Sequence, residues 1–156
     1  MIDIRKAEIT DIEHFQRIHE LAVRELAKNY YEPEQIDVWA KGSSPEKLAA
    51  AIEAGKAFIA EYDGKPAGYA MIDLASGWVL AVYVAPEYAG RGVGTALCSY
   101  VEKLAVGHGL KSLYLDASLN AFHFYTGIGY VEVERKAFQI AKDIKMDSVN
   151  MKKSIG

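Results

Sequence analysis

The sequence predicts an α/β fold in which about seven mostly antiparallel strands form one mixed sheet, with one central parallel pair and helices on both faces. Three features predict this fold. Two apolar segments, 77–84 and 112–117, flank a run with helical spacing, and such a β-α-β unit makes its strands parallel with a right-handed crossover. The turn sequence DGK joins two further apolar segments, 56–62 and 66–74, as in an antiparallel hairpin. Two more strand-like segments close the chain and are expected to pair antiparallel.

The first third of the chain is predicted to contain a strand, a long helix and two short helices. Residues 2–6 alternate between apolar and polar side chains, which is typical of a half-buried strand. Thr10 is predicted to cap the long helix, with a capping-box glutamate three residues later, and apolar residues at helical spacing extend this helix to about Lys28. Proline is favoured in a first helical turn, so short helices are predicted to begin at Pro33 and Pro45.

The elements after the hairpin are predicted from apolar runs and from glycines. The segment 77–84 is almost wholly apolar, so we expect it to be buried on both faces, and 112–117 is predicted to be another buried strand. The helix between them is expected to stop at Gly107 or Gly109. Ser118 is predicted to cap a short helix that follows.

Length, charge and cysteine content restrict the kind of protein. The 156 residues fit one domain, 1–156, with a sizeable core. A net charge of −3 argues against a non-specific nucleic-acid binder. No apolar run approaches the roughly 20 residues of a membrane span, and the charged start is no secretory signal, so we expect no membrane partner. Cys98 is the only cysteine, which excludes an internal disulfide, favours a cytoplasmic location and predicts a small buried hydrophobe.

A glycine-rich loop, AGRGVGT, stands where the strand 77–84 gives way to the next helix. A helix N-terminus presents unpaired N–H groups and partial positive charge, and glycines let an anion approach the backbone. With Arg91 as a nearby cation, the loop favours a phosphate or pyrophosphate site. Thr95 excludes the G-x-G-x-x-G dinucleotide fingerprint, and the Lys-Ser/Thr pair of a P-loop is absent. The alternative is a tight turn that binds nothing.

A second polar cluster follows the next strand. Asn120 and Tyr125 are expected near the same end of the sheet as the glycine loop, where both could face a ligand. A tyrosine hydroxyl can donate a proton or a hydrogen bond to a leaving group. The alternatives are a core aromatic residue for Tyr125 and a helix-start hydrogen bond for Asn120, while His123 is expected to be a partly exposed helix residue.

The two segments VYVAPEYAGRGVGTAL and SLNAFHFYTGIGY, in this order and spacing, resemble the GCN5-related N-acetyltransferase (GNAT) superfamily. The resemblance extends over essentially the whole chain. It implies the fold of that family and the cofactor acetyl-CoA, whose pyrophosphate lies on a loop of pattern Q/R-x-x-G-x-G/A. Here Ala89 replaces the Gln or Arg, so the backbone and Arg91 are expected to hold the pyrophosphate.

The resemblance also implies roles for individual residues. Tyr125 matches a tyrosine near the thioester sulfur, and it is expected to assist thiolate departure through a strong hydrogen bond or with a pKa lowered by its helix N-terminus. The N–H of Val84 is expected to stabilise the tetrahedral oxyanion. The cofactor-binding residues implied by the match are Val82, Tyr83, Val84, Ala89, Gly90, Arg91, Gly92, Val93, Gly94, Thr95, Asn120 and Tyr125.

The general base and the acceptor are less well defined by the resemblance. Leu80 stands where many relatives carry a carboxylate, so the candidate bases are Asp116, a water chain or a carboxylate from 30–37; Asp116 could equally be a simple hydrogen-bond acceptor. The acceptor site is expected at Tyr30, Tyr31, Glu32 and Trp39. Acids and aromatic rings suit a cationic amine, and the alternative is a solvated acidic face.

The predicted function is therefore transfer of an acetyl group from acetyl-CoA to a primary amine, on a small molecule or on a peptide or protein, with coenzyme A as product. A non-catalytic acetyl-CoA-binding regulatory module and a site for a different phosphate-bearing ligand are the alternatives. No metal site is expected, because His14 and His19 are five residues apart and do not share one helix face. Relatives often dimerise, so a homodimer is a further expectation.

Overall fold

The computed structural model describes residues 1–156 and contains one seven-stranded sheet with the order β1-β2-β3-β4-β5-β7-β6. Every neighbouring pair is antiparallel except β4 and β5, which are parallel, so the predicted mixed sheet with one parallel pair is confirmed. The strands are β1 (Ile2–Lys6), β2 (Ala57–Tyr62), β3 (Lys65–Asp73), β4 (Trp78–Val84), β5 (Ser112–Ser118), β6 (Val131–Ala141) and β7 (Ile144–Ser154).

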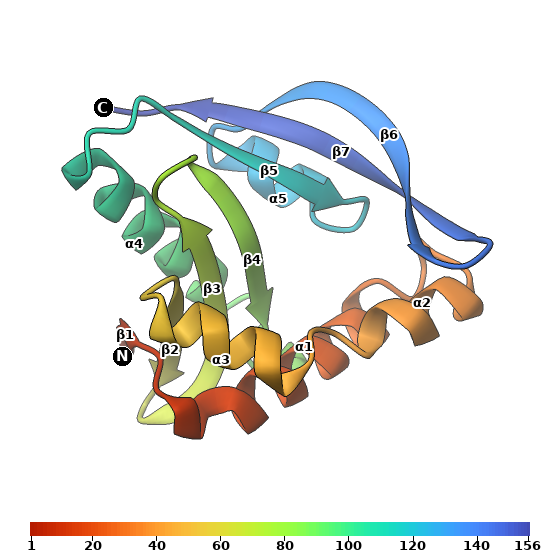
Figure 1. Ribbon diagram of the computed structural model, residues 1–156, viewed down its shortest axis with the longest axis horizontal. Helices are drawn as coiled ribbons and strands as arrows, with labels where there is room; N and C mark the ends of the chain where they lie inside the picture. Colours follow the sequence, from red (N-terminus) through yellow and green to blue (C-terminus); the bar gives the residue numbers. More distant parts are fainter.

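The helices cover both faces of this sheet. Figure 1 shows α1 and α3 crossing one face of β2–β4, while α4 lies on the other. The bounds are α1 (Ile12–Leu26), α2 (Pro33–Ala40), α3 (Pro45–Glu53), α4 (Val93–Gly107) and α5 (Phe122–Gly127), with single 3-10 turns η1 (Ile9–Asp11) and η2 (Pro86–Tyr88). None of these helices has both the length and the apolar character needed to cross a bilayer.

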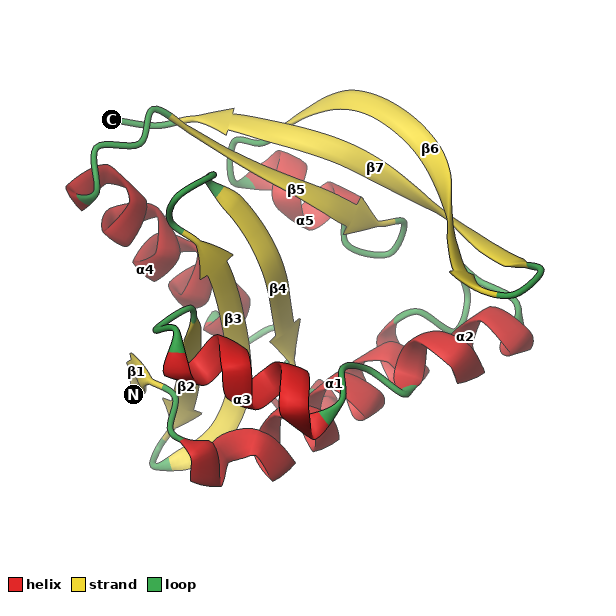
Figure 2. Cartoon of the chain, in the orientation of Figure 1, coloured by secondary structure: helices red, strands yellow, loops and turns green.

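The parallel strands β4 and β5 diverge along their length. They share a single register pair, Trp78 with Tyr114, and Figure 2 shows them separating beyond it. The prediction that 77–84 is buried on both faces is therefore wrong: Leu80 is 53% exposed, because it lies at a bulge in the pairing of β4 with β3 and β5 does not pair with β4 at this level. Likewise, β5 buries only alternate residues, and Asp116 is exposed. The divergence leaves space between the two strands at the centre of the sheet.

The predicted helix caps at Thr10 and Ser118 are both wrong, because the helices that they were expected to cap begin at other residues. Before α1 the chain makes the turn η1, and its capping interaction comes from Asp11, whose Oδ2 accepts the Glu8 N–H at 2.8 Å; Thr10 lies inside this turn. Ser118 is still the last residue of β5, and its carbonyl accepts the Ala121 N–H in a turn that precedes α5.

Tyr31 connects three parts of the fold that are distant in sequence. Its buried hydroxyl donates to the Asp147 carbonyl at 2.7 Å and accepts from the Leu119 N–H at 2.8 Å. The first bond reaches β7 and the second reaches the loop between β5 and α5. This residue therefore ties the segment between α1 and α2 to the diverging half of the sheet.

Replacing Tyr31 by Phe is expected to lower the free energy of unfolding by about 1–3 kcal/mol, because it leaves the Leu119 N–H and the Asp147 carbonyl unpaired. Urea denaturation followed by circular dichroism measures the loss. The matched control is Tyr30→Phe: Tyr30 is adjacent, 51% exposed and makes no hydrogen bond through its hydroxyl, so its removal should change stability by about 0.5 kcal/mol or less. Equal losses in the two variants would contradict the bridging role of Tyr31.

Candidate active site

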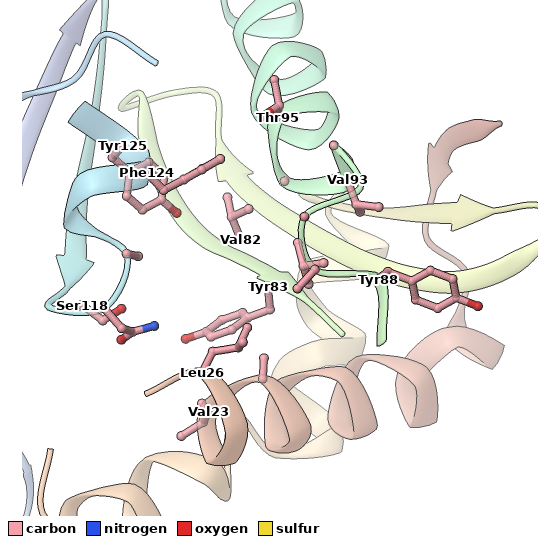
Figure 3. A pocket seen from close by; sticks show the side chains of 18 of the residues that line it. Val23, Leu26, Val82, Tyr83, Tyr88, Val93, Thr95, Ser118, Phe124 and Tyr125 are labelled. Carbon is pink, nitrogen blue, oxygen red and sulfur yellow. The ribbon is translucent and has the colours of Figure 1, made fainter. Parts of the chain in front are cut away.

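A cavity of about 560 Å³ lies between α1, the carboxyl-terminal half of β4 and the starts of α4 and α5 (Figure 3). It is where the divergence of β4 from β5 leaves the sheet open. The lining residues come from α1 and the segment after it, from β4 and the glycine loop, and from the segment Ser118–Tyr125. Segments separated by some hundred residues of sequence thus contribute to one site.

The glycine loop forms one end of this cavity. Gly90 and Gly92 have φ of +77° and +86°, which is the left-handed region that glycine adopts without strain. Gly92 is the N-cap of α4 and no side chain caps the helix; the first helical bond runs from the Ala96 N–H to the Gly92 carbonyl at 3.0 Å. The preceding N–H groups of the first turn are therefore available to a ligand.

Arg91 is the one expected cofactor residue that does not line the cavity. Its guanidinium carbon lies 5.5 Å from the ring centre of Tyr62 and 5.9 Å from that of Tyr88, over the two rings. The exposed loop leaves this side chain free to pack on these neighbouring rings. All the other residues expected to bind the cofactor, from Val82 to Tyr125, line the cavity.

Tyr125 lies on the opposite side of the cavity, on α5. Its side chain is buried, and its hydroxyl has no hydrogen-bond partner among the protein's own groups. Burial raises the pKa of Tyr125 well above its ordinary value, and the nearby Cys98 and Tyr83 act in the same direction. The expectation that a helix N-terminus lowers this pKa is therefore wrong, because Tyr125 is the fourth residue of α5 and the loss of water around its buried phenol favours the neutral form. Tyr125 is a neutral hydrogen-bond donor at physiological pH.

Asn120 and His123 differ in their relation to the cavity. The Oδ1 atom of Asn120 is buried and has no hydrogen-bond partner, although the residue lines the cavity. A buried acceptor without a partner is costly, so this atom is suited to receive a hydrogen bond from a ligand. His123 was expected to be a partly exposed helix residue; it is exposed on α5 and does not line the cavity.

Asp116, the candidate base, lies outside the main cavity. It lines a smaller adjoining cavity of about 80 Å³ together with Leu80. Its Oδ1 accepts a hydrogen bond from Asn150 Nδ2 at 3.1 Å and is 3.9 Å from Lys136 Nζ. Asp116 therefore already accepts a hydrogen bond within the sheet, next to a cation.

The expected acceptor residues separate into two groups. Tyr30 and Trp39 line the cavity, whereas Tyr31 is buried before α2 and its hydroxyl donates to the Asp147 carbonyl of β7. Glu32 is exposed at the start of α2, and it does not line the cavity. Asp37, on the exposed side of α2, binds Arg24 at 2.8 Å. The aromatic half of the predicted acceptor site is thus present in the cavity, and the acidic half forms a solvated face.

Trp39 is held against β4 by a small aromatic cluster. Its Nε1 donates to the Tyr83 hydroxyl at 3.2 Å, and its carbonyl oxygen is 2.7 Å from Nε2 of His19. Burial raises the pKa of Tyr83 to about 12, and burial lowers the pKa of His19 below its ordinary value. Both side chains are therefore neutral at pH 7, and they fix the position of the Trp39 ring beside the cavity.

The cavity also contains residues that the sequence reasoning missed. These come from α1, from the turn η2, from the end of β5 and from the start of α5: Ala22, Val23, Leu26, Tyr88, Ser118, Ala121 and Phe124. Periodicity marked the α1 positions as the buried face of a helix, and nothing in the pattern distinguishes a residue that faces a core from one that faces a cavity. Cys98 lies outside the cavity; burial raises the pKa of its thiol to about 12, consistent with an unreactive core residue.

Comparisons with known proteins identify relatives over nearly the whole chain. The sequence model described as Acetyltransferase (GNAT) family matches residues 15–130. The uncharacterised N-acetyltransferase YafP of Escherichia coli (strain K12) is 29% identical over 138 residues, which are 86% of this chain and 85% of YafP. The crystal structure of a GCN5-related N-acetyltransferase from Rhodopseudomonas palustris superposes with a TM-score of 0.90 at 31% identity, covering 98% of this chain and 95% of that one. The PaiA N-acetyltransferase from Thermoplasma acidophilum, crystallised with coenzyme A, superposes with a TM-score of 0.79 at 23% identity, covering 99% of each chain.

Proposed function

Because the chain belongs to the acetyltransferase (GNAT) family, we propose that it transfers the acetyl group of acetyl-CoA directly to a primary amine. The observation that carries this proposal is one cavity that joins the uncapped start of α4 to the neutral hydroxyl of Tyr125. The first feature suits a pyrophosphate and the second suits a leaving thiolate. The coenzyme A complex of the PaiA protein supports the choice of cofactor.

The residues of the cavity fit such a cofactor in three places. The N–H groups at the start of α4 can bind the pyrophosphate, because Gly90 and Gly92 keep the approach to them free of side chains. The unpaired Oδ1 of Asn120 can accept a hydrogen bond from an amide of the pantetheine arm. The apolar side chains of Val82 and Phe124 provide walls for the same arm.

In the proposed reaction, bound acetyl-CoA supplies a thioester carbonyl that an amine attacks. A backbone N–H at the end of β4, that of Val84 in our assignment, would stabilise the negative charge that develops on the carbonyl oxygen. Tyr125 would donate a hydrogen bond to the departing sulfur, and its raised pKa keeps the donor proton on the hydroxyl. These two groups act on opposite ends of the bond that breaks.

A non-catalytic acetyl-CoA-binding module is the second candidate function, because no carboxylate or histidine lines the main cavity. Calorimetric titration with acetyl-CoA should show binding in either case, so the product assay distinguishes the candidates. Release of free thiol above the rate of hydrolysis, together with an N-acetylated product identified by mass, should occur with at least one amine if the protein is an enzyme. Binding without any acetylated product over a broad amine panel would favour the regulatory module.

The orientation of Arg91 leads to a prediction about how the glycine loop binds acetyl-CoA. Arg91→Ala should raise the Kd for acetyl-CoA by no more than about fivefold, because an exposed charge that packs outside the cavity contributes about 1 kcal/mol or less. Calorimetry at 50 mM and 200 mM salt measures this change. A much larger loss that diminishes at the higher salt concentration would contradict it, and would indicate that the guanidinium leaves Tyr62 and Tyr88 to contact the phosphates.

A further inference from the structure

The end of the cavity opposite the glycine loop is apolar and aromatic. It is formed by Ala22, Val23, Leu26, Tyr30, Trp39 and Tyr83. Figure 3 shows Tyr83 lying over α1 beside Leu26 and Val23. No Asp, Glu, Lys, Arg or His lines any part of the cavity, so an acceptor at this end meets no counter-charge.

The charged side chains near this end face other partners. Arg24, on α1, binds Asp37 at 2.8 Å and Glu20 at 3.3 Å, and none of these three side chains lines the cavity. Glu32 and Glu34 are exposed to solvent on α2. Their positions exclude them from direct contact with an amine inside the cavity.

The buried titratable groups closest to this end, His19, Tyr83 and Tyr125, are neutral near pH 7. His19 lies behind Tyr83, with ring centres 4.5 Å apart, and its Nε2 is bonded to the Trp39 carbonyl. Tyr83 and Tyr125 have raised pKa values and are already protonated. Asp116, in the smaller adjoining cavity, accepts a hydrogen bond from Asn150 and lies near Lys136. The cavity thus offers neither a base nor an ion-pair partner.

An ammonium group at this end would have only the ring faces of Tyr30, Trp39 and Tyr83 in place of a counter-charge. Ring faces offset only part of the cost of leaving water, so this cavity favours an amine that loses its proton in water. At pH 7 about one in ten α-amino groups is neutral, against about one in 2,500 lysine-type amines. Resting on the proposed function, we propose that the acceptor is a weakly basic primary amine carried on an apolar or aromatic body. The aromatic end of the cavity holds the body, and the neutral amine enters without assistance from a base.

The chemistry is balanced without a further reactant. The neutral nitrogen forms a bond to the acetyl carbon, the carbon–sulfur bond breaks, and the sulfur leaves with its electron pair. The sulfur leaves as a thiolate that accepts a hydrogen bond from Tyr125, and it then takes a proton from water to become a thiol. The proton that the amine loses on forming the amide goes to water at the open side of the cavity.

The test is a panel of four amines with acetyl-CoA, in which thiol release and acetylated product are measured at pH 7 and low amine concentration. Phenylalaninamide is weakly basic and aromatic, 2-phenylethylamine is strongly basic and aromatic, glycinamide is weakly basic without an apolar body, and agmatine is cationic. We expect phenylalaninamide to be at least about tenfold better than each of the others, because only it has both a neutral amine and an apolar body. Between pH 7 and 9 the rate with 2-phenylethylamine should rise about tenfold per pH unit, while that with phenylalaninamide levels off near pH 8.

The outcomes separate this inference from the proposed function. Agmatine as the best acceptor, or a rate with 2-phenylethylamine that does not rise with pH, would overturn the inference and leave acetyl transfer standing. Binding of acetyl-CoA with no acetylated product from any amine would overturn both.

A protein variant with a charge in the cavity wall provides a second test of the same inference. Leu26 is 40% exposed at the end of α1, so Leu26→Glu should fold and should raise the rate ratio of agmatine to phenylalaninamide at least about tenfold. The matched control is Val106→Glu, because Val106 is 44% exposed near the end of α4 and does not line the cavity. An unchanged ratio in Leu26→Glu, with a folded protein, would count against an acceptor at this end.

Discussion

Replacing Tyr125 by Phe should lower kcat about a hundredfold and change the Kd for acetyl-CoA by less than about threefold, because donors to a leaving group contribute about 10²-fold or more to rate. The phenol hydroxyl faces the cavity without an internal partner, so its loss removes a contact that matters when the sulfur departs. Steady-state kinetics with the best amine of the panel and calorimetric titration measure the two quantities. The Tm should stay close to that of the wild type, because no internal hydrogen bond is lost.

The matched control is Tyr130→Phe. Tyr130 is 4% exposed and its ring centre lies 5.5 Å from that of Tyr125, but it does not line the cavity. Its replacement should leave kcat within about twofold of the wild type. A Tyr125→Phe enzyme with near-normal turnover would contradict the donor role.

The raised pKa of Tyr125 also has a consequence for the pH profile. A phenol whose pKa is raised stays protonated as the pH rises, so deprotonation of Tyr125 should not lower the rate up to about pH 10, the ordinary tyrosine value. The rising part of the profile should instead follow the pKa of the amine that is used. A falling limb between pH 7 and 9 that disappears in Tyr125→Phe would contradict this assignment.

Replacing Gly94 by Leu should raise the Kd for acetyl-CoA at least about a hundredfold, because the new side chain occupies space that the pantetheine arm needs. A Cβ at this position would lie 3.3 Å from Cζ of Phe124 and 3.6 Å from Cγ2 of Val84, and both residues line the cavity. The larger leucine would extend between α4, β4 and α5. Calorimetric titration, with circular dichroism to verify folding, measures the effect.

Gly107→Leu provides the control on the same helix. Gly107 is exposed, at the other end of α4, and a Cβ there meets no atom within 4 Å. The same glycine-to-leucine change should stabilise the helix by several tenths of a kcal/mol up to about 1 kcal/mol and leave the Kd unchanged. Equal affinity in the Gly94→Leu and Gly107→Leu proteins would show that acetyl-CoA does not bind between Phe124 and Val84.

Local patterns predicted most elements of this fold because each signal acts over a few residues. Pro33 and Pro45 begin short helices as expected, since proline fixes the backbone angle of a first helical turn. The caps at Thr10 and Ser118 were wrong, because a 3-10 turn and an extended strand end move the helix starts. Several hydrogen-bonding solutions compete at such boundaries, and the surrounding packing selects one of them.

The candidate site was predicted in part for a related reason. Backbone features of the glycine loop are local, so the start of α4 could be assigned from sequence. Side-chain direction is not local: Arg91 packs on Tyr62, which belongs to a distant strand, and the sequence offers no signal for that contact. The same holds for the acidic residues of α2, because the partner of Asp37 is on another helix.

The sequence alone therefore determined the mixed sheet, the glycine-rich loop at the start of α4 and the likeness to one family, because periodicity, turn residues and motif spacing encode local backbone structure. Only the tertiary structure decided that β4 separates from β5, that an uncharged cavity follows, and that Trp39 and Tyr83 form its aromatic end. The physical reason is that apolar spacing on a helix or strand specifies which side turns inward. It does not specify whether that side meets another side chain or an open space, since this depends on how distant elements pack together.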